Sequence, residues 1–161
     1  MKEIYLSIFL SLCTVSLVFA TIDEDKPYCF HFRWVPPMYD NRPEKYNCTM
    51  SKGVPCIEPL ISTKLPPNMT ELWDMRNETL LCPLTSGNVC IKYVFEYNNN
   101  IVNMSFFCGK IMEDQVTAIT SGCYQQNVGG YTVEACACES RREPCNASIK
   151  TKYSVILMIY N

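Results

Sequence analysis

The sequence predicts a small all-β, disulfide-rich fold, and three observations lead to this prediction. The chain has 161 residues, of which 48% are hydrophobic and 19% charged, a balance that fits one globular domain and not a disordered chain. It has 11 cysteines against a single histidine. Its second half consists of short runs rich in β-branched and aromatic residues, separated by turn-forming asparagines and glycines. Disulfides add much of the stability that so small a core lacks.

The first 20 residues are typical of a cleaved secretory signal peptide. An apolar run without charge follows Glu3 and ends at Val18-Phe19-Ala20, with small residues where signal peptidase requires them. Cleavage removes Cys13 from the 11 cysteines and leaves ten, the even number that five disulfides need. A retained membrane anchor is the alternative, although an apolar run of about 17 residues is at the short limit for a spanning helix.

Charge and sequons indicate an extracellular protein. The net charge of −2 argues against nucleic acid as a partner, because phosphate binding normally requires a basic excess. N-x-Ser/Thr sequons support passage through the secretory pathway. Asn68 and Asn77 are the most available of these acceptors. The full set of acceptors is Asn47, Asn68, Asn77, Asn103 and Asn146.

The predicted strands lie mainly between residues 89 and 138. Val89–Tyr97 and Ile101–Cys108 alternate as strands do, and Asn98-Asn99-Asn100 between them predicts a hairpin. Gly129-Gly130 predicts a second turn. Further strands are expected at Gln115–Thr120 and Tyr131–Cys138, and one short helix at Glu71–Leu81, with Leu72, Met75 and Thr79 on one face.

The cysteine spacing resembles that of a known family. Ten cysteines can pair in hundreds of ways, so spacing alone leaves the connectivity open. The ending Cys136-Ala-Cys138-x6-Cys145-Asn146 resembles the close of the lymphocyte-antigen-six/urokinase-receptor (LU) superfamily, which has the three-finger fold. Cys82-x7-Cys90, Cys90-x17-Cys108 and Cys123-x12-Cys136 are similar to its second and third fingers. The first finger departs from the family, because it lacks the usual Cys-x-x-Cys opening and is enlarged.

The resemblance implies one domain over residues 21–148 and specific roles within it. Asn146 would be a structural clamp, hydrogen-bonded to the backbone where the fingers meet, rather than a glycosylated residue. The implied disulfides are Cys29–Cys90, Cys48–Cys56, Cys82–Cys108, Cys123–Cys136 and Cys138–Cys145.

The resemblance also implies that recognition lies at the fingertips. Tyr97 and Asn98, Asn99 and Asn100 form the expected tip of the second finger. Residues 124–130, including Tyr124, Gln125 and Gln126, form the expected tip of the third. Strand alternation assigns about half of the other aromatic residues of finger two to a packed face. These residues are Tyr93, Phe95, Phe106 and Phe107.

No pattern in the sequence predicts an enzyme, a cofactor or a metal site. His31 is the only histidine, and it stands among aromatic residues without the partners that a hydrolase needs. Cys136 and Cys138 are zinc ligands in principle, but a secretory setting favours disulfides.

The sequence therefore predicts a non-enzymatic extracellular protein that binds and modulates a cell-surface protein: a receptor, an ion channel or an adhesion or junction protein. A growth-factor receptor ectodomain from a truncated chain is the alternative. Residues 149–161 form a short apolar tail. Asn146 to Ser148 would suit attachment of a glycosylphosphatidylinositol anchor, but Tyr153–Tyr160 is a clipped version of the signal, so free secretion is favoured over anchoring.

Overall fold

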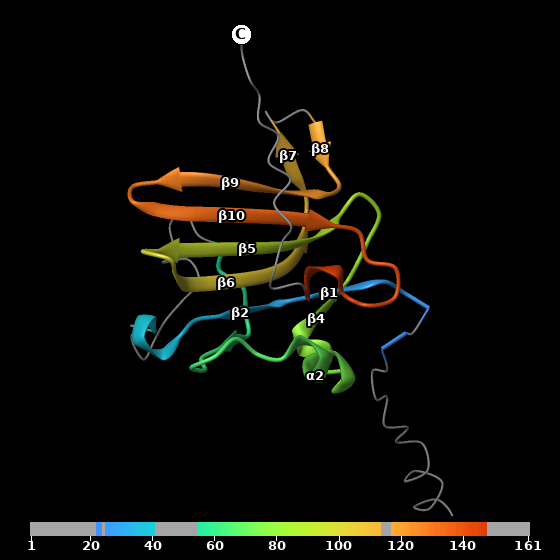
Figure 1. The fold of residues 1–161 in the computed structure, drawn as a ribbon. Coiled ribbons are helices and arrows are strands. Elements are labelled where there is room, and N and C mark those ends of the chain that lie inside the picture. The colour runs from blue at the N-terminus through green and yellow to red at the C-terminus, as the bar shows by residue number, and fades with distance from the viewer. Residues whose placement is uncertain (1–21, 24, 41–54, 114–116, 148–161) are drawn as a thin grey trace, which may run out of the picture.

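The computed structural model describes residues 22–23, 25–40, 55–113 and 117–147, and its secondary structure is mostly β (Figure 1). The predicted signal peptide, the sequon at Asn47, Cys48 and the apolar tail lie outside the described residues. The strands are β1 (Tyr28–Phe30), β2 (Phe32–Trp34), β3 (Leu60–Ile61), β4 (Leu81–Pro83), β5 (Val89–Tyr97), β6 (Asn100–Gly109), β7 (Ile111–Glu113), β8 (Thr117–Ile119), β9 (Gly122–Val128) and β10 (Tyr131–Cys138). The helical segments are η1 (Pro37–Tyr39), α2 (Met69–Asp74), η3 (Glu78–Leu80) and η4 (Cys145–Ala147).

A six-stranded sheet organises the chain, with the strand order β3-β2-β6-β5-β10-β9. Its neighbours are antiparallel except for β2 and β3, which are parallel. Two further pairs, β1 with β4 and β7 with β8, form small separate sheets. Figure 1 shows the β5–β6 and β9–β10 hairpins lying side by side, with their turns at the same end.

Both predicted hairpins are confirmed. Asn98 and Asn99 have φ angles of 50° and 59°, and Gly129 and Gly130 have φ angles of 58° and 86°. Two consecutive residues at positive φ make the turn that matches the right-handed twist of antiparallel strands. Asparagine and glycine tolerate this conformation best, which explains why the chain reverses at these positions.

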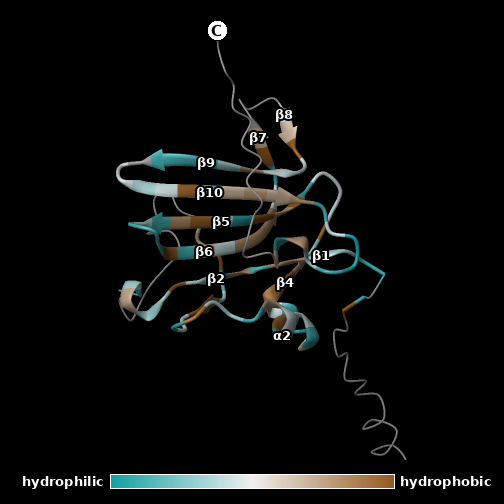
Figure 2. Cartoon of the chain, in the orientation of Figure 1, coloured by the Kyte–Doolittle hydropathy of each residue, from teal (hydrophilic) through white to brown (hydrophobic). Residues whose placement is uncertain are grey.

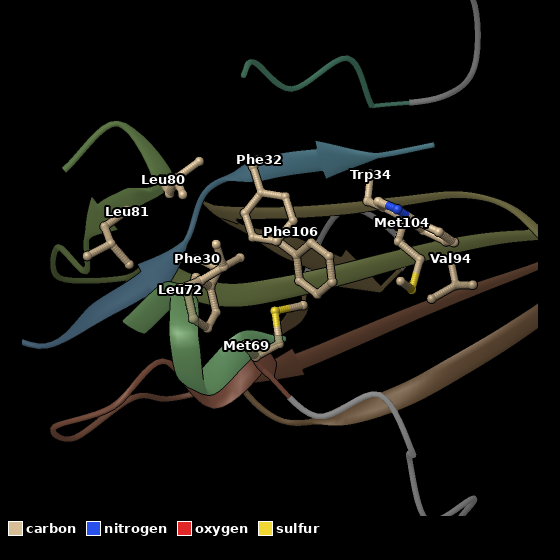
Figure 3. Close-up of a cluster of buried hydrophobic side chains, with 10 residues drawn as sticks. All are labelled: Phe30, Phe32, Trp34, Met69, Leu72, Leu80, Leu81, Val94, Met104 and Phe106. Atoms are coloured by element: carbon tan, nitrogen blue, oxygen red, sulfur yellow. The ribbon is translucent and has the colours of Figure 1, made fainter. Parts of the chain in front are cut away.

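One face of the sheet builds the main hydrophobic core. The register places Phe32 opposite Phe106 and Trp34 opposite Met104. The rings of Phe32 and Phe106 are 4.7 Å apart, and both side chains are fully buried. Figure 3 shows Met69 and Leu72 of α2 pointing at this cluster from outside the sheet. The remaining members of the cluster are Phe30, Leu80, Leu81 and Val94.

The predicted helix at Glu71–Leu81 is wrong in its extent and in its face. The α-helix begins after the Asn68 cap and ends at Asp74, because Arg76 adopts a φ of 49° and Asn77 then caps a separate 3-10 turn. The buried residues between positions 69 and 81 are Met69, Leu72, Leu80 and Leu81, whereas Met75 is 61% exposed. After the break at Arg76, Leu80 of η3 packs in the same core as Met69 and Leu72.

Four disulfides hold one end of the sheet, which we call the base. Cys29–Cys90 joins β1 to β5, and Cys82–Cys108 joins β4 to β6. Cys123–Cys136 crosses from β9 to β10, and Cys138–Cys145 closes the loop that follows β10. All four are pairs that the family resemblance implies. Cys56 is also disulfide-bonded, and its implied partner Cys48 lies outside the described residues.

Candidate functional site

The end of the sheet opposite the base presents two turns next to each other. Strands β5 and β10 pair along their whole length, with Tyr97 opposite Tyr131. The Asn98–Asn99 turn follows Tyr97 directly, and the Gly129–Gly130 turn precedes Tyr131. Sequence segments about thirty residues apart therefore meet at one edge of the molecule. In Figure 2 the outer end of β5 and most of β9 are hydrophilic, in contrast to the hydrophobic β4.

Three aromatic rings form a stack beneath these turns. Phe95 and Tyr131 stack with centroids 4.6 Å apart and an interplanar angle of 19°. Tyr97 also contacts Tyr131, with ring centroids 4.9 Å apart and an interplanar angle of 39°. Phe95 and Tyr97 share a face because they are two residues apart on one strand. Such stacks fix ring positions, because each ring restricts the rotamers of its neighbour.

This surface, which we call the tip surface, consists of Tyr97, Asn98, Asn99, Asn100 and Tyr131. Tyr97 is 43% exposed, and the three asparagines are exposed, as expected for a binding tip. The Asn100 amide donates a hydrogen bond to the carbonyl oxygen of Asn98 over 3.0 Å and braces the turn. The tip surface therefore combines rigid rings with uncharged hydrogen-bonding groups.

The predicted tip of the third finger is wrong in its placement. Tyr124, Gln125 and Gln126 lie within β9 and pair with β10, and the turn itself contains only Gly129 and Gly130. A two-residue turn with both residues at positive φ reverses the chain at once, so the strand extends to Val128. These three residues are exposed along an edge of the sheet, not at its end.

Sequence reasoning missed Tyr131 as a member of the site. Its position directly after a Gly-Gly turn indicated a residue at a hairpin end. Its contact with Tyr97 depends on β5 and β10 being neighbours, which is a property of strand order and not of local sequence. The other aromatic residues on β5 and β6 differ in burial. Phe106 is fully buried, whereas Tyr93, Phe95 and Phe107 are half-buried.

Asn146 connects three parts of the base. Its Oδ1 accepts a hydrogen bond from the Phe30 backbone N–H over 3.0 Å. Its amide nitrogen donates to the carbonyl oxygens of Phe30 and Ile91, at 3.2 Å and 3.0 Å. The side chain is only 3% exposed, so its nitrogen is not accessible to a glycosyltransferase in the folded chain. These hydrogen bonds to the backbone of β1 and β5 are the contacts that the predicted clamp requires.

The other described sequons differ in access. Asn68 and Asn77 are exposed, and each caps a helical segment by accepting a backbone N–H, from Thr70 and Thr79 respectively. Asn103 is half-buried in β6, and its Oδ1 accepts a hydrogen bond from the Ser105 hydroxyl. Helix α2 and the turn after it therefore present the most accessible acceptors of the described residues.

A buried ion pair lies between the base and the tip surface. The Lys92 Nζ atom is 3.8 Å from the Glu134 carboxylate, and both residues are buried. Burial lowers the pKa of Lys92, and the Glu134 charge acts in the opposite direction. A cavity of about 200 Å³ lies beside Lys92, lined mainly by the disulfides of β9, β10 and η4. The two buried charges compensate each other, so we assign the ion pair a structural role.

The Nδ1 atom of His31 is buried, and the described cysteines are disulfide-bonded. The Nδ1 atom of His31 is buried without a hydrogen-bond partner in the described part of the chain, and burial lowers the pKa of its imidazole. The sulfur atoms of Cys29, Cys82 and Cys108 lie within 4.8 Å of one another, but all three belong to disulfides. Cys136 and Cys138 are likewise disulfide-bonded, so neither offers a thiolate to a metal.

Within the residues that the structure describes, no helix has the length and apolar character needed to cross a membrane. Comparison of the chain with protein-family models, with curated proteins and with solved structures finds no match.

Proposed function

We propose that this protein is a non-enzymatic extracellular binding protein that engages a protein on the cell surface through its tip surface. The observation that supports this proposal most strongly is the aromatic stack of Phe95, Tyr131 and Tyr97 beneath exposed asparagines. Aromatic side chains held in place by neighbours supply large contact area at low entropic cost, which is why tyrosine is enriched in binding hot spots.

The composition of the tip surface favours a protein partner. Tyrosine, asparagine and glycine are the residues that antibody loops use for the same task, because they combine rigid rings with adaptable hydrogen bonding. The exposed members of the tip surface are uncharged. The partner we expect is therefore a folded receptor, channel or adhesion protein with a largely neutral, partly apolar contact area, and not a strongly charged polymer.

We further propose that the chain has a three-finger fold of the LU type with an enlarged first finger. Four disulfides follow the pairing that the resemblance implies, and Asn146 ties the strands together at the base. The segment between Cys29 and Cys82 contains β2, β3, α2 and η3, which accounts for its length. The disulfides are typical of proteins in oxidising compartments, in agreement with an extracellular location.

Binding to intact cells tests this function. The chain, expressed with its own N-terminus, is labelled and titrated on cells of the tissue that produces it. Tyr97→Ala should weaken binding about tenfold or more, the loss typical of an interface hot spot. It should lower the free energy of unfolding by less than about 1 kcal/mol, because Tyr97 is 43% exposed and its removal costs Tyr131 one ring contact.

A matched control separates recognition from general surface effects. Leu65 is 77% exposed in the segment between β3 and α2, so Leu65→Ala removes a comparably accessible apolar side chain away from the tip surface. It should leave binding unchanged. If Tyr97→Ala binds as well as the natural chain, the tip surface is not the recognition surface. A loss of about 3 kcal/mol in stability would instead show that Tyr97 belongs to the core.

A further inference from the structure

Among the described residues, strand β9 is an edge strand of the main sheet, and it carries no charge. It is the last strand in the sheet order, after β10, and forms the upper margin of the sheet in Figure 1. Its residues 122–128, GCYQQNV, include no charged residue and no proline, and its pairing with β10 has no bulge. The opposite edge is the two-residue strand β3. Natural edge strands are normally short, charged, bulged or covered, since an open edge invites pairing with another chain.

The register shows which backbone groups of β9 face this edge. The Cα atoms of Cys123 and Cys136 are 4.0 Å apart, the spacing of a pair that does not exchange hydrogen bonds. Tyr124 and Gln126 therefore direct their N–H and C=O groups to β10. The same groups of Cys123, Gln125 and Asn127 point away from β10. The two-residue turn at Gly129–Gly130 leads to the same assignment. Val128 and Tyr131 close this turn as a hydrogen-bonded pair, and hydrogen-bonded pairs alternate along the strand from there.

We propose that β9 pairs with β9 of a second copy of this chain, antiparallel, about a two-fold axis at Gln125. The outward-facing residues are spaced symmetrically about Gln125, so Gln125 would exchange both backbone hydrogen bonds with its equivalent. Cys123 would lie opposite Asn127 of the other copy. The two main sheets would then form one continuous sheet, and the contact would close as a dimer because each chain uses the one long edge that its main sheet has in the described residues.

The neutral sequence of β9 favours a second copy as the occupant. A two-fold axis places identical side chains opposite each other, so any charge at its centre would repel itself. Gln125 is uncharged, and its amide both donates and accepts hydrogen bonds. The net charge of −2 per chain adds little long-range repulsion.

Glycans and the tip surface leave this edge free. The described sequons lie on α2, at the start of η3, on β6 and on η4, and none lies on β9. The antiparallel arrangement directs the two tip surfaces away from each other, at opposite ends of the joined sheet. The pairing of β9 rests on its register and neutrality alone, and does not depend on what the tip surface binds.

A charge at the two-fold axis tests the proposal. The glycosylated chain, purified from a eukaryotic host, should have the mass of two copies by light scattering at about 10 μM. Gln125→Lys places two lysines opposite each other and should raise the dimer dissociation constant about tenfold or more. Gln126→Lys, the matched control, adds the same charge on the other face of β9, opposite Tyr124 of the partner copy, and should change the constant much less.

Mixing Gln125→Lys with the natural chain shows whether the variant is still folded and able to pair. In a mixed dimer a single lysine would lie opposite Gln125, so tagged Gln125→Lys should still co-purify with the untagged natural chain. A natural chain that is monomeric at about 10 μM, or assembles beyond two copies, overturns the proposal. Equal weakening by Gln125→Lys and Gln126→Lys, or failure of the mixed dimer to form, overturns the two-fold axis at Gln125.

Discussion

Asn146 shows how much of the base depends on one side chain. Asn146→Ala leaves the Phe30 N–H and the Ile91 C=O buried without their partner, so it should lower the free energy of unfolding by about 3 kcal/mol. Denaturant unfolding without reductant measures this loss. Asn88→Ala, which removes a side-chain bond in an exposed turn, should cost less than about 1 kcal/mol. Mass spectrometry should find no glycan lost with Asn146→Ala, and a lost glycan would contradict the clamp.

His31 should make the fold sensitive to mild acid. Burial lowers the pKa of His31 below its ordinary value of 6.5, so the unfolded chain takes up this proton first as the pH falls. Stability is therefore fully present above pH 6.5 and declines as the pH drops below it, by at most about 1.4 kcal/mol per pH unit. Because the chain has one histidine, His31→Gln should remove this decline. If the free energy of unfolding changed equally for the natural chain and for His31→Gln between pH 7.5 and 5.5, this prediction would be contradicted.

The turn at Asn98–Asn99 can be tested as an element. Asn99 has a φ of 59°, so Asn99→Val should destabilise the hairpin by about 1–2 kcal/mol, whereas Asn99→Gly should be neutral or stabilising. Gln126→Val is the control, because Gln126 is exposed within β9, where a β-branched residue fits. Thermal unfolding of the three variants measures the order of their stabilities. Equal melting temperatures for Asn99→Val and Asn99→Gly would show that the turn does not require its left-handed conformation.

Long alternating strands were predictable from the sequence, and short ones were not. Val89–Tyr97 and Tyr131–Cys138 match β5 and β10 residue for residue, because each shows several periods of alternation bounded by turn residues. Strands β1, β2 and β3 span two or three residues, too few to show a period. Their positions depend on distant partners, such as the pairing of Phe32 with Phe106.

The candidate site was also predictable only where local sequence determines it. The exposure of Tyr97 and Asn98 follows from their place at a hairpin end, so local sequence was sufficient. The contact with Tyr131 requires the order of strands in the sheet, which one sequence does not contain. Local sequence does not fix the length of the turn between β9 and β10, so it predicts a tip that includes Gln125 and Gln126, whereas the two-residue turn leaves both within the strand.

At the scale of the whole molecule, five disulfides should account for the ten cysteines of residues 21–161. Nine described cysteines are disulfide-bonded. Alkylation of the purified chain in denaturant without reductant should therefore give no gain in intact mass. The same treatment after reduction should modify every cysteine. An adduct formed without reductant would reveal a free thiol and contradict the fifth bond, which the resemblance assigns to Cys48 and Cys56.

Recognition by the tip surface is the central claim, and a glycan placed on it gives the most direct test. Asn100→Thr completes a sequon with Asn98 as acceptor, within the turn. Ala118→Asn completes one with Thr120, placing a glycan of the same size on the exposed β8. Mass spectrometry confirms that both sites are occupied, and titration on intact cells measures binding. The glycan at Asn98 should reduce binding by about tenfold or more, because it covers the residues expected to contact the partner, whereas the glycan on β8 should leave binding unchanged. Full binding by the chain glycosylated at Asn98 would contradict recognition through the tip surface.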